Sequence, residues 1–340
     1  MVDLSTSYAG LTLKNPLVVS ASPLSKEIGN LRHMEDAGAA AIVLHSLFEE
    51  QINIESNELD KYLWSSADVS AEAMNFYPNL ENYNIGPEAY LEHIRKAKQA
   101  VSVPVFGSLN GVSEGGWVRY AKLMEEAGAD GIELNIYFLA TDGQENCTAI
   151  EDQYVQLVQA VKAQLKVPLT VKIGPYFSSM THVAKRLDEA GADGLIIFNR
   201  FYQPDFDLST LEVFPSLELS RSSELTLRLH WAAVLFGRIK ADIAITGGVH
   251  SSADVIKAMM AGARVAMTTS ALLKSGIGVL RSMLIGVEEW IKENDYQSIR
   301  QMQGSMSQQK VANPAAFNRA NYMKVLSSYA LRDLTDPVTK

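Results

Sequence analysis

One phrase recurs four times along the chain and constrains the fold more than any other feature. The copies are EDAGAAAIVL from Glu35, EEAGADGIEL from Glu125, DEAGADGLII from Asp188 and MMAGARVAMT from Met259. Each has the pattern of a helix end, a glycine cap, a short turn and an apolar strand. Two further phrases join a helix to a strand through Val-Pro, AVSVPVFGSL from Ala100 and QLKVPLTVKI from Gln164. The repetition predicts regular alternation of helices and strands.

Eight segments of the chain fit as apolar strands, with helical patterns in most of the gaps. They are residues 16–21, 40–46, 103–108, 131–137, 168–173, 194–199, 242–246 and 264–268. Apolar strands alternating with amphipathic helices imply a parallel sheet covered on both faces, and eight such units predict a closed (β/α)8 TIM barrel of the α/β class. An open doubly wound sheet is the alternative. Its usual GxGxxG sign is absent, because SASPLSKE follows the first strand.

Two connections are too long for plain joints, residues 47–85 and 200–223. In a barrel, such insertions usually build walls at the carboxyl-terminal mouth of the strands. We expect residues 1–295 to form the barrel domain. Residues 296–340, which include NPAAFNRANYMKVLSSYA, are expected to form a helical extension packed on the barrel.

Composition excludes several classes of protein. The net charge of -9, without clusters of Lys and Arg, argues against a nucleic-acid partner. A single cysteine, Cys147, excludes an intrachain disulfide framework and a cysteine-rich metal or iron–sulfur site built by this chain alone. No long apolar run or secretory leader is visible. A cytoplasmic protein with no membrane partner is therefore expected.

The strand ends give the candidate site, because the carboxyl ends of barrel strands face the active site. Gly247 and Gly248 follow the seventh strand, and Thr269 and Ser270 follow the eighth. Glycines let backbone N–H groups approach an anion, hydroxyls add donors, and a helix start adds positive dipole. A tight turn with a helix cap is the plain alternative for the glycine pair. Taken together, the two strand ends favour a phosphate site.

A phosphate site suggests a phosphate-bearing cofactor, since the chain has no NAD fingerprint, no P-loop and no metal motif such as HExxH. FMN fits this description, and no metal site is predicted. Lys172 lies at the end of an apolar strand, where a charged side chain is not expected to contribute to hydrophobic packing. A cation beside the N1–O2 edge of a flavin would stabilise its anionic reduced form. Pairing with Glu133 inside the barrel is the other interpretation, and the two are compatible.

These motifs together resemble the dihydroorotate dehydrogenase family over about residues 5–305. The matching stretches are GLTLKNPLVVSAS, GIELNIYF, VPLTVKIGPYF, ITGGVHSSADVIKAMMAGARVAMTTSAL and DYQSIRQMQG. The resemblance implies an FMN-dependent barrel that oxidises dihydroorotate to orotate, or a related CH–CH substrate, by hydride transfer to flavin N5. Because no membrane helix precedes the barrel, the chain is similar to the soluble class, whose members are commonly homodimers.

The resemblance also implies roles for individual residues. Ala21, Ser22, Ser46 and Ser108 would lie beside the flavin, and Lys172 would hold its N1–O2 side. The backbones of Gly247, Gly248, Thr269 and Ser270 would bind the phosphate. Asn135 would contact both flavin and substrate, while Asn199, with the neighbouring Arg200, would bind the substrate.

The chain departs from the family pattern where the family has its base. Tyr137, Phe138, Leu139 and Ala140 occupy the places of the family's Ser-Cys-Pro-Asn loop, in which Cys, or Ser in the membrane-linked class, removes the substrate proton. The family's lysine after the second strand is replaced by His45, and Arg200 replaces a small residue. In AMNFYPNL, Pro78 and Asn79 are kept, but Ala73 stands where a substrate-binding asparagine is usual.

Other side chains could serve as the base. His45 is the main candidate, because imidazole has a suitable intrinsic pKa and the residue ends a strand. It could equally hydrogen-bond the flavin or Ser46. Cys147 has weaker support, and Tyr137 and Tyr176 are candidate phenolic donors.

The leading functional hypothesis is an FMN-dependent oxidoreductase of dihydroorotate dehydrogenase type. The alternatives are a non-redox barrel enzyme that binds a phosphorylated metabolite, and a flavin-binding homologue without dihydroorotate activity. With one cysteine there is no internal cluster to carry electrons, so the acceptor stays open. Fumarate, a nicotinamide reached through a separate electron-transfer partner, or another oxidant would each be compatible with the sequence.

Overall fold

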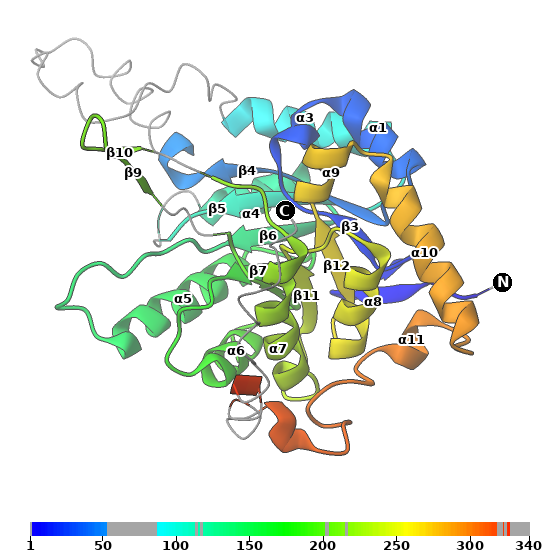
Figure 1. Ribbon diagram of the computed structural model, residues 1–340. Helices are drawn as coiled ribbons and strands as arrows, with labels where there is room; N and C mark the ends of the chain where they lie inside the picture. The colour runs from blue at the N-terminus through cyan, green and yellow to red at the C-terminus, as the bar shows by residue number, and fades with distance from the viewer. Residues whose placement is uncertain are drawn as a thin grey trace, which may run out of the picture.

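A computed structural model describes residues 2–52, 87–112, 115, 118–200, 204–214, 217–317, 322, 325 and 326. It confirms the predicted barrel: eight parallel strands close on one another in the order β11-β12-β3-β4-β5-β6-β7-β8 (Figure 1). Their bounds are β3 Leu17–Val19, β4 Ala41–Phe48, β5 Val105–Asn110, β6 Gly131–Asn135, β7 Leu169–Ile173, β8 Gly194–Ile197, β11 Asp242–Thr246 and β12 Val265–Thr268. All eight predicted strands are present: β11 has the predicted bounds, and the ends of the others differ from the prediction by at most two residues.

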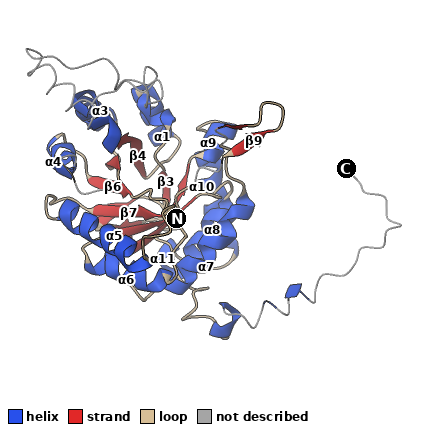
Figure 2. Ribbon diagram, turned by 90° about the vertical axis from the view of Figure 1, so that its left-hand side faces the viewer, coloured by secondary structure: helices blue, strands red, loops and turns tan. Residues whose placement is uncertain are grey.

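Helices surround the strands and cover the outside of the barrel (Figures 1 and 2). They are α1 Ile28–Asp36, α3 Pro87–Ala100, α4 Arg119–Glu126, α5 Cys147–Lys162, α6 Met180–Glu189, α7 Leu225–Leu235, α8 Ser252–Ala261, α9 Ser270–Ser275, α10 Val279–Glu293 and α11 Ile299–Met302, with 3-10 turns η1 Pro23–Lys26, η5 Ser222–Glu224 and η6 Pro314–Phe317.

The recurring phrase folds the same way each time. Its four glycines, Gly38, Gly128, Gly191 and Gly262, have φ values of 108°, 103°, 105° and 118°, so each ends its helix in the left-handed conformation that glycine adopts most easily. Two copies share a further contact after the glycine. Asp130 accepts hydrogen bonds from Lys98 and the N–H of Val105, and Asp193 accepts from Lys162 and the N–H of Leu169. Each aspartate stands just before one strand and ties its turn to the start of the preceding strand of the barrel, β5 for Asp130 and β7 for Asp193.

Two apolar clusters make the core, one outside the strands and one inside the barrel. The outer cluster joins the strands to the helices and contains residues such as Leu44, Ile94 and Leu157. The inner cluster contains Val18, Val43, Phe106, Ile196, Ala244 and Met267. The alternation of side chains along each strand separates these two layers.

An N-terminal hairpin that the sequence pattern did not indicate closes the amino-terminal end of the barrel. It pairs β1 Thr6–Tyr8 with β2 Leu11–Leu13. The ring of Tyr8 is 1% exposed, lies 6.1 Å from the ring of Phe106, and belongs to the inner cluster. The carboxylate of Asp242 accepts from the N–H of Ala9, which fixes the hairpin to β11. Within the described part of the chain, the hairpin thus covers the barrel interior at this end and leaves it open toward the carboxyl-terminal mouth.

The long insertions are partly described. After β8 a second hairpin forms from β9 Asp205–Asp207 and β10 Glu212–Phe214, which the sequence did not predict (Figure 1). Most of the insertion after β4, with Ala73, Pro78 and Asn79, lies outside the described residues, as does most of the tail after residue 317. Among the helices that are described, none has the length and apolar character needed to cross a membrane.

Candidate active site

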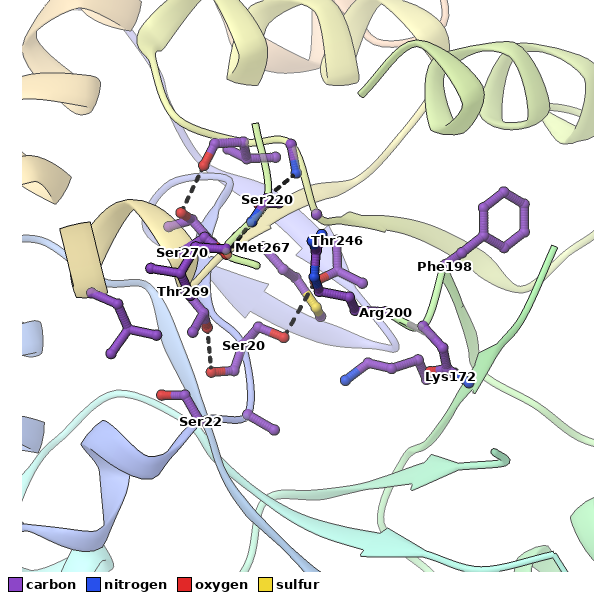
Figure 3. Close-up of a pocket in the computed structure, with 18 of the residues that line it drawn as sticks. Ser20, Ser22, Lys172, Phe198, Arg200, Ser220, Thr246, Met267, Thr269 and Ser270 are labelled. Atoms are coloured by element: carbon purple, nitrogen blue, oxygen red, sulfur yellow. Dashed lines mark hydrogen bonds between the residues drawn. The ribbon is translucent and has the colours of Figure 1, made fainter. Parts of the chain in front are cut away.

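A cavity of about 290 Å³ opens at the carboxyl ends of the barrel strands (Figure 3). We call it the main chamber. Its volume lies at the lower end of the range of about 300–1,000 Å³ that is usual for small-molecule sites. The predicted residues that line it are Ala21, Ser22, Ser46, Asn135, Lys172, Asn199, Arg200, Gly247, Gly248, Thr269 and Ser270. The structure therefore brings these predicted residues together from strand ends that are far apart in the sequence.

The glycine pair after β11 forms one end of the chamber. Gly247 and Gly248 have φ values of 85° and 82°, so two successive residues adopt positive φ values that glycine tolerates best and that let the backbone line the chamber closely. A Cβ atom on Gly248 would lie 2.5 Å from the backbone nitrogen of Leu225. Ser220 borders this end, and its hydroxyl accepts from the N–H of Gly248 at 3.3 Å. Thr269 and Ser270, at the end of β12, lie at the same end of the chamber, and the hydroxyl of Ser270 accepts from the N–H of Ser220 at 3.2 Å (Figure 3).

Arg228 is a buried cation at the same end that the sequence reasoning missed. The residue is 6% exposed, and its guanidinium donates to the backbone carbonyls of Thr246 and Glu224. A Cβ on Gly247 would lie 2.8 Å from this guanidinium. No carboxylate of the described residues forms an ion pair with Arg228, so an anion at the glycine pair would meet a positive charge. The available signal was an arginine inside the apolar run LTLRLHWAAVL.

Lys172 sits at the other end of the chamber, paired with a carboxylate. Its amine donates to Oε1 of Glu133 at 2.6 Å, and the side chains are 8% and 0% exposed. The hydroxyl of Ser108 donates to the same oxygen at 3.3 Å, and Ser108 and Ser46 share a hydrogen bond of 2.8 Å. Ser108 thus lies beneath the chamber and is joined to its lining through Ser46. The predicted pairing of Lys172 with Glu133 is confirmed, while the amine still borders the cavity (Figure 3).

Three polar side chains in the lining keep an unsatisfied atom. Within the part of the chain that the structure describes, Ser22 Oγ, Asn135 Oδ1 and Asn199 Oδ1 are buried without a hydrogen-bond partner. The orientation of Asn199 is set by its amide nitrogen, which donates to the carbonyl of Ile136 at 2.9 Å. An unsatisfied buried polar atom costs about 1–3 kcal/mol. These atoms therefore favour a ligand that supplies hydrogen bonds, N–H donors above all.

Arg200 lines the chamber but is engaged in an ion pair. Its guanidinium donates to Oε2 of Glu224 at 2.7 Å, and both side chains are about one-third exposed. Glu224 immediately precedes α7, the helix that carries Arg228. Arg200 consequently holds the insertion after β8 against this helix, and its charge is already compensated in this arrangement.

His45 borders a second cavity of about 450 Å³, which shares Ala21, Ser22, Pro23 and Ser46 with the main chamber. The residue is 9% exposed, and its ring centroid lies 5.0 Å from that of Tyr90 and 5.4 Å from that of His93. Burial lowers the pKa of His45 to about 4, and the charges of His93 and Lys26 act in the same direction. The imidazole is therefore neutral at pH 7.

This depressed pKa predicts a loss of stability in acid. Between pH 6.5 and 4 the unfolded chain binds a proton at His45 that the folded protein excludes, so the free energy of unfolding should fall by up to about 3 kcal/mol. Urea unfolding at a series of pH values measures this. The variant His45→Gln should show a shallower pH dependence, whereas His33→Gln, at an exposed position, should not. An unchanged slope in His45→Gln would contradict the assignment.

The other candidate bases lie in different surroundings. Cys147 is exposed at the first position of α5, and Tyr176 is 69% exposed; neither lines the main chamber. Tyr137 does line it. Phe138 instead packs against the outer apolar cluster.

Comparison with known proteins assigns the chain to a family. The family model for dihydroorotate dehydrogenase matches residues 3–291. The chain is 26% identical over 309 residues to the catalytic subunit of dihydroorotate dehydrogenase B (NAD(+)) from Thermoplasma volcanium, covering 89% of this chain and 98% of the relative. It is 25% identical over 306 residues to the subunit of the same name from Methanocaldococcus jannaschii, covering 86% and 94%.

The resemblance inferred from the motifs is thus confirmed over nearly the whole chain. The match includes all eight barrel strands and every strand end that contributes to the main chamber. The chain belongs to the dihydroorotate dehydrogenase family of oxidoreductases, which act on CH–CH groups.

Proposed function

We propose that this dihydroorotate dehydrogenase-like oxidoreductase binds FMN in the main chamber and oxidises or reduces a small ring-shaped substrate at a CH–CH bond. The observation that carries the proposal is the pairing, in one cavity, of a left-handed glycine cradle with a buried lysine at the opposite end. The cradle suits a phosphate and the lysine suits the electron-rich edge of a flavin.

The residues present fit FMN in three respects. A side chain at Gly247 would clash with the Arg228 guanidinium and one at Gly248 with the backbone of Leu225, so only glycine lets the chain pass this close to both. The buried charge of Arg228 would be balanced by the phosphate. The unsatisfied oxygens of Asn135 and Asn199 would accept from N–H groups of the flavin or of the substrate. An anion at a glycine-rich strand end is a recurrent arrangement in barrels.

When bound, the cofactor supplies hydride transfer to or from the substrate. The protein's own residues bind and orient. Lys172 keeps a positive charge at the inner end of the chamber, where Glu133 holds its amine in place and Ser108 donates to the same carboxylate oxygen. Burial of this pair excludes water from the charge and so strengthens its effect on a neighbouring anion.

The first test is the cofactor. Purified protein should be yellow and should release FMN on denaturation, and the apoprotein should quench FMN fluorescence with saturable binding. Sugar phosphates should not displace the flavin. A colourless protein that cannot be reconstituted with FMN, but that sugar phosphates stabilise against heat, would favour the non-redox alternative.

Dihydroorotate is proposed as one candidate substrate. The curated relatives carry that activity in their names. The chain differs at Phe138 and Ala140, where the family keeps its base and a partner asparagine. Anaerobic mixing of the FMN-loaded protein with dihydroorotate should bleach the flavin if it is the substrate. Absence of bleaching, with reduction by dithionite intact, would reject it.

The proposal also covers the cellular location, the oligomeric state, the domain boundaries and the electron-transfer partner. We place the enzyme in the cytoplasm as a homodimer, with residues 1–295 as the FMN-binding barrel and 296–340 as an extension packed on it. A separate electron-transfer partner would connect the flavin to a nicotinamide, as the relatives' names suggest for them. Sedimentation equilibrium tests the dimer.

A further inference from the structure

A break in the register of β4 turns one serine side chain into the barrel. The pairing of β4 with β5 is regular at Ile42 and Val43 and resumes, shifted, at Ser46. Leu47, the next residue, belongs to the outer cluster, whereas Ser46 lines both the main chamber and the second cavity. Irregularities of this kind commonly re-aim a side chain beside a ligand site. The shift in β4 therefore places the Ser46 hydroxyl where the two cavities meet.

Ser46 begins a row of three polar side chains on adjacent strands. Strand pairing sets Ser46 beside Ser108 on β5, and Ser108 beside Glu133 on β6. The two hydroxyl oxygens lie 2.8 Å apart, and Ser108 Oγ donates to Glu133 Oε1 at 3.3 Å. Because the Ser108 proton is directed to the carboxylate, Ser46 is the donor in the bond between the two hydroxyls. The row thus leads from the chamber lining to a carboxylate that is 0% exposed.

The surroundings of Glu133 make its carboxylate the group of this row that can gain a proton. Its Oε1 accepts from Lys172 and Ser108, while Oε2 has no hydrogen-bond partner among the described residues. The charge of Glu133 also acts on the phenols of Tyr8 and Tyr90. Burial, with a further contribution from that charge, raises the pKa of both phenols above the usual value for tyrosine. Both phenols therefore keep their protons at neutral pH.

Charge balance gives the reason for a proton to move along the row. Lys172 and Glu133 are neutral as a pair, and their side chains are 8% and 0% exposed. A hydride delivered to the proposed cofactor adds a negative charge near Lys172, so two anions would share one buried cation. Close like charges in surroundings of low dielectric favour proton uptake by one of them. A proton on Glu133 restores neutrality and leaves the charge of Lys172 to the cofactor.

From this arrangement we propose that Ser46, Ser108 and Glu133 form the proton relay of the site, with the Glu133 carboxylate as the final acceptor. When a CH–CH bond is oxidised, one C–H bond breaks to give the hydride, and the other breaks to give a proton to Ser46 Oγ. The Ser46 proton passes to Ser108 and the Ser108 proton to Glu133, where an O–H bond forms. The electrons of the second C–H bond form the C=C bond. The relay supplies the base that Phe138 cannot.

The pH dependence of the midpoint potential of bound FMN tests the relay. Transfer of a hydride equivalent takes up one proton with two electrons, and protonation of Glu133 adds a second proton. The potential should fall by about 60 mV per pH unit in the unmodified protein and by about 30 mV in Glu133→Gln, because each proton per two electrons contributes about 30 mV. Glutamine keeps an oxygen for Lys172 and Ser108 but takes up no proton. Glu189→Gln, the same change at a side chain that is 63% exposed, should keep the slope of the unmodified protein.

Infrared difference spectroscopy locates the second proton. Reduction of the unmodified protein should produce the carbonyl band of an un-ionised carboxylic acid, and this band should be absent in Glu133→Gln. Ser108→Ala interrupts the row but keeps Lys172 paired with Glu133, so it tests the relay even where Glu133→Gln does not fold. After light-driven reduction the acid band should form about 10²- to 10⁴-fold more slowly in Ser108→Ala, the usual effect of removing a positioned proton-transfer group.

The opposite results are equally distinct. A slope of about 30 mV per pH unit in the unmodified protein would overturn the proposal, as would a slope of about 60 mV that survives in Glu133→Gln. An acid band that forms equally fast in Ser108→Ala would overturn the route through the serines. The inference rests on the proposed FMN site, and failure of that site would show earlier, as protein that binds no flavin.

Discussion

Replacing Lys172 with methionine is expected to lower the free energy of unfolding of the cofactor-free protein by about 3–5 kcal/mol. The change leaves Glu133, which is 0% exposed, without its 2.6 Å partner. Ser108 would still donate to Oε1 at 3.3 Å, but Oε2 has no hydrogen-bond partner among the described residues. A buried charge with so little compensation either destabilises the fold or takes up a proton. Urea unfolding followed by circular dichroism measures the loss.

The double variant Lys172→Met, Glu133→Gln separates the charge from the packing. It removes both charges, so we expect it to recover a large part of the stability that the single change costs. Lys185→Met is the matched surface control, because Lys185 pairs with Glu189 at 3.7 Å and both side chains are 63% exposed. That change should cost no more than about 1 kcal/mol. A Lys172→Met variant as stable as the surface control would refute the account of the buried pair.

Replacing Lys172 with methionine should also change the midpoint potential of the proposed flavin. Loss of the cation at the inner end of the chamber removes stabilisation of the anionic reduced form, so the midpoint potential of bound FMN should fall. This comparison requires that the variant still binds FMN, which the fluorescence titration establishes first.

Replacing Gly248 with alanine is expected to weaken FMN binding at least about 100-fold, which corresponds to about 3 kcal/mol. The residue has a φ of 82°, and the new Cβ would lie 2.5 Å from the backbone nitrogen of Leu225 and 2.9 Å from its Cα. Leu225 begins α7, so relief of the clash requires the helix start or the cradle itself to move. Either movement would displace the backbone that we propose binds the phosphate. Quenching of FMN fluorescence by the apoprotein gives the affinity.

Gly276 provides a control with the same φ and no clash. It also has a φ of 82°, and a Cβ atom added there would meet no described atom within 4 Å. Gly276→Ala should therefore lose some stability through its positive φ, of about 1–3 kcal/mol, and keep its affinity for FMN. If both alanine variants lost FMN to the same extent, the close approach of Leu225 to Gly248 would not be the cause.

The barrel could be predicted because its signals are local. Each copy of the recurring phrase carries a helix end, a left-handed glycine and an apolar strand within ten residues, and Gly38, Gly128, Gly191 and Gly262 adopt the predicted conformation. Parallel strands joined by helices have few ways to bury their apolar faces, so the repetition indicated closure into a barrel. The glycine pair at 247–248 could also be recognised from a local signal, because two adjacent glycines indicate a turn with positive φ values.

Other features depend on contacts between distant parts of the chain, and only the tertiary structure decided them. The β1–β2 hairpin is short and closes the barrel through Tyr8 against Phe106, about a hundred residues away in sequence. The low pKa of His45 comes from burial beside Tyr90 and His93 on α3. Neither effect leaves a pattern in the neighbouring sequence.

The few residues at the end of β6 show the same contrast between what the sequence predicts and what the tertiary structure decides. The sequence by itself determined that Glu133 and Asn135 share a face, because the period of a strand is two residues. It also showed that aromatic residues replace the family's base. Which of Tyr137 and Phe138 would face the chamber was decided by the outer cluster, where Tyr154 and its neighbours provide an apolar surface for Phe138. Burial of that ring against the outer cluster leaves the phenol of Tyr137 at the mouth of the barrel.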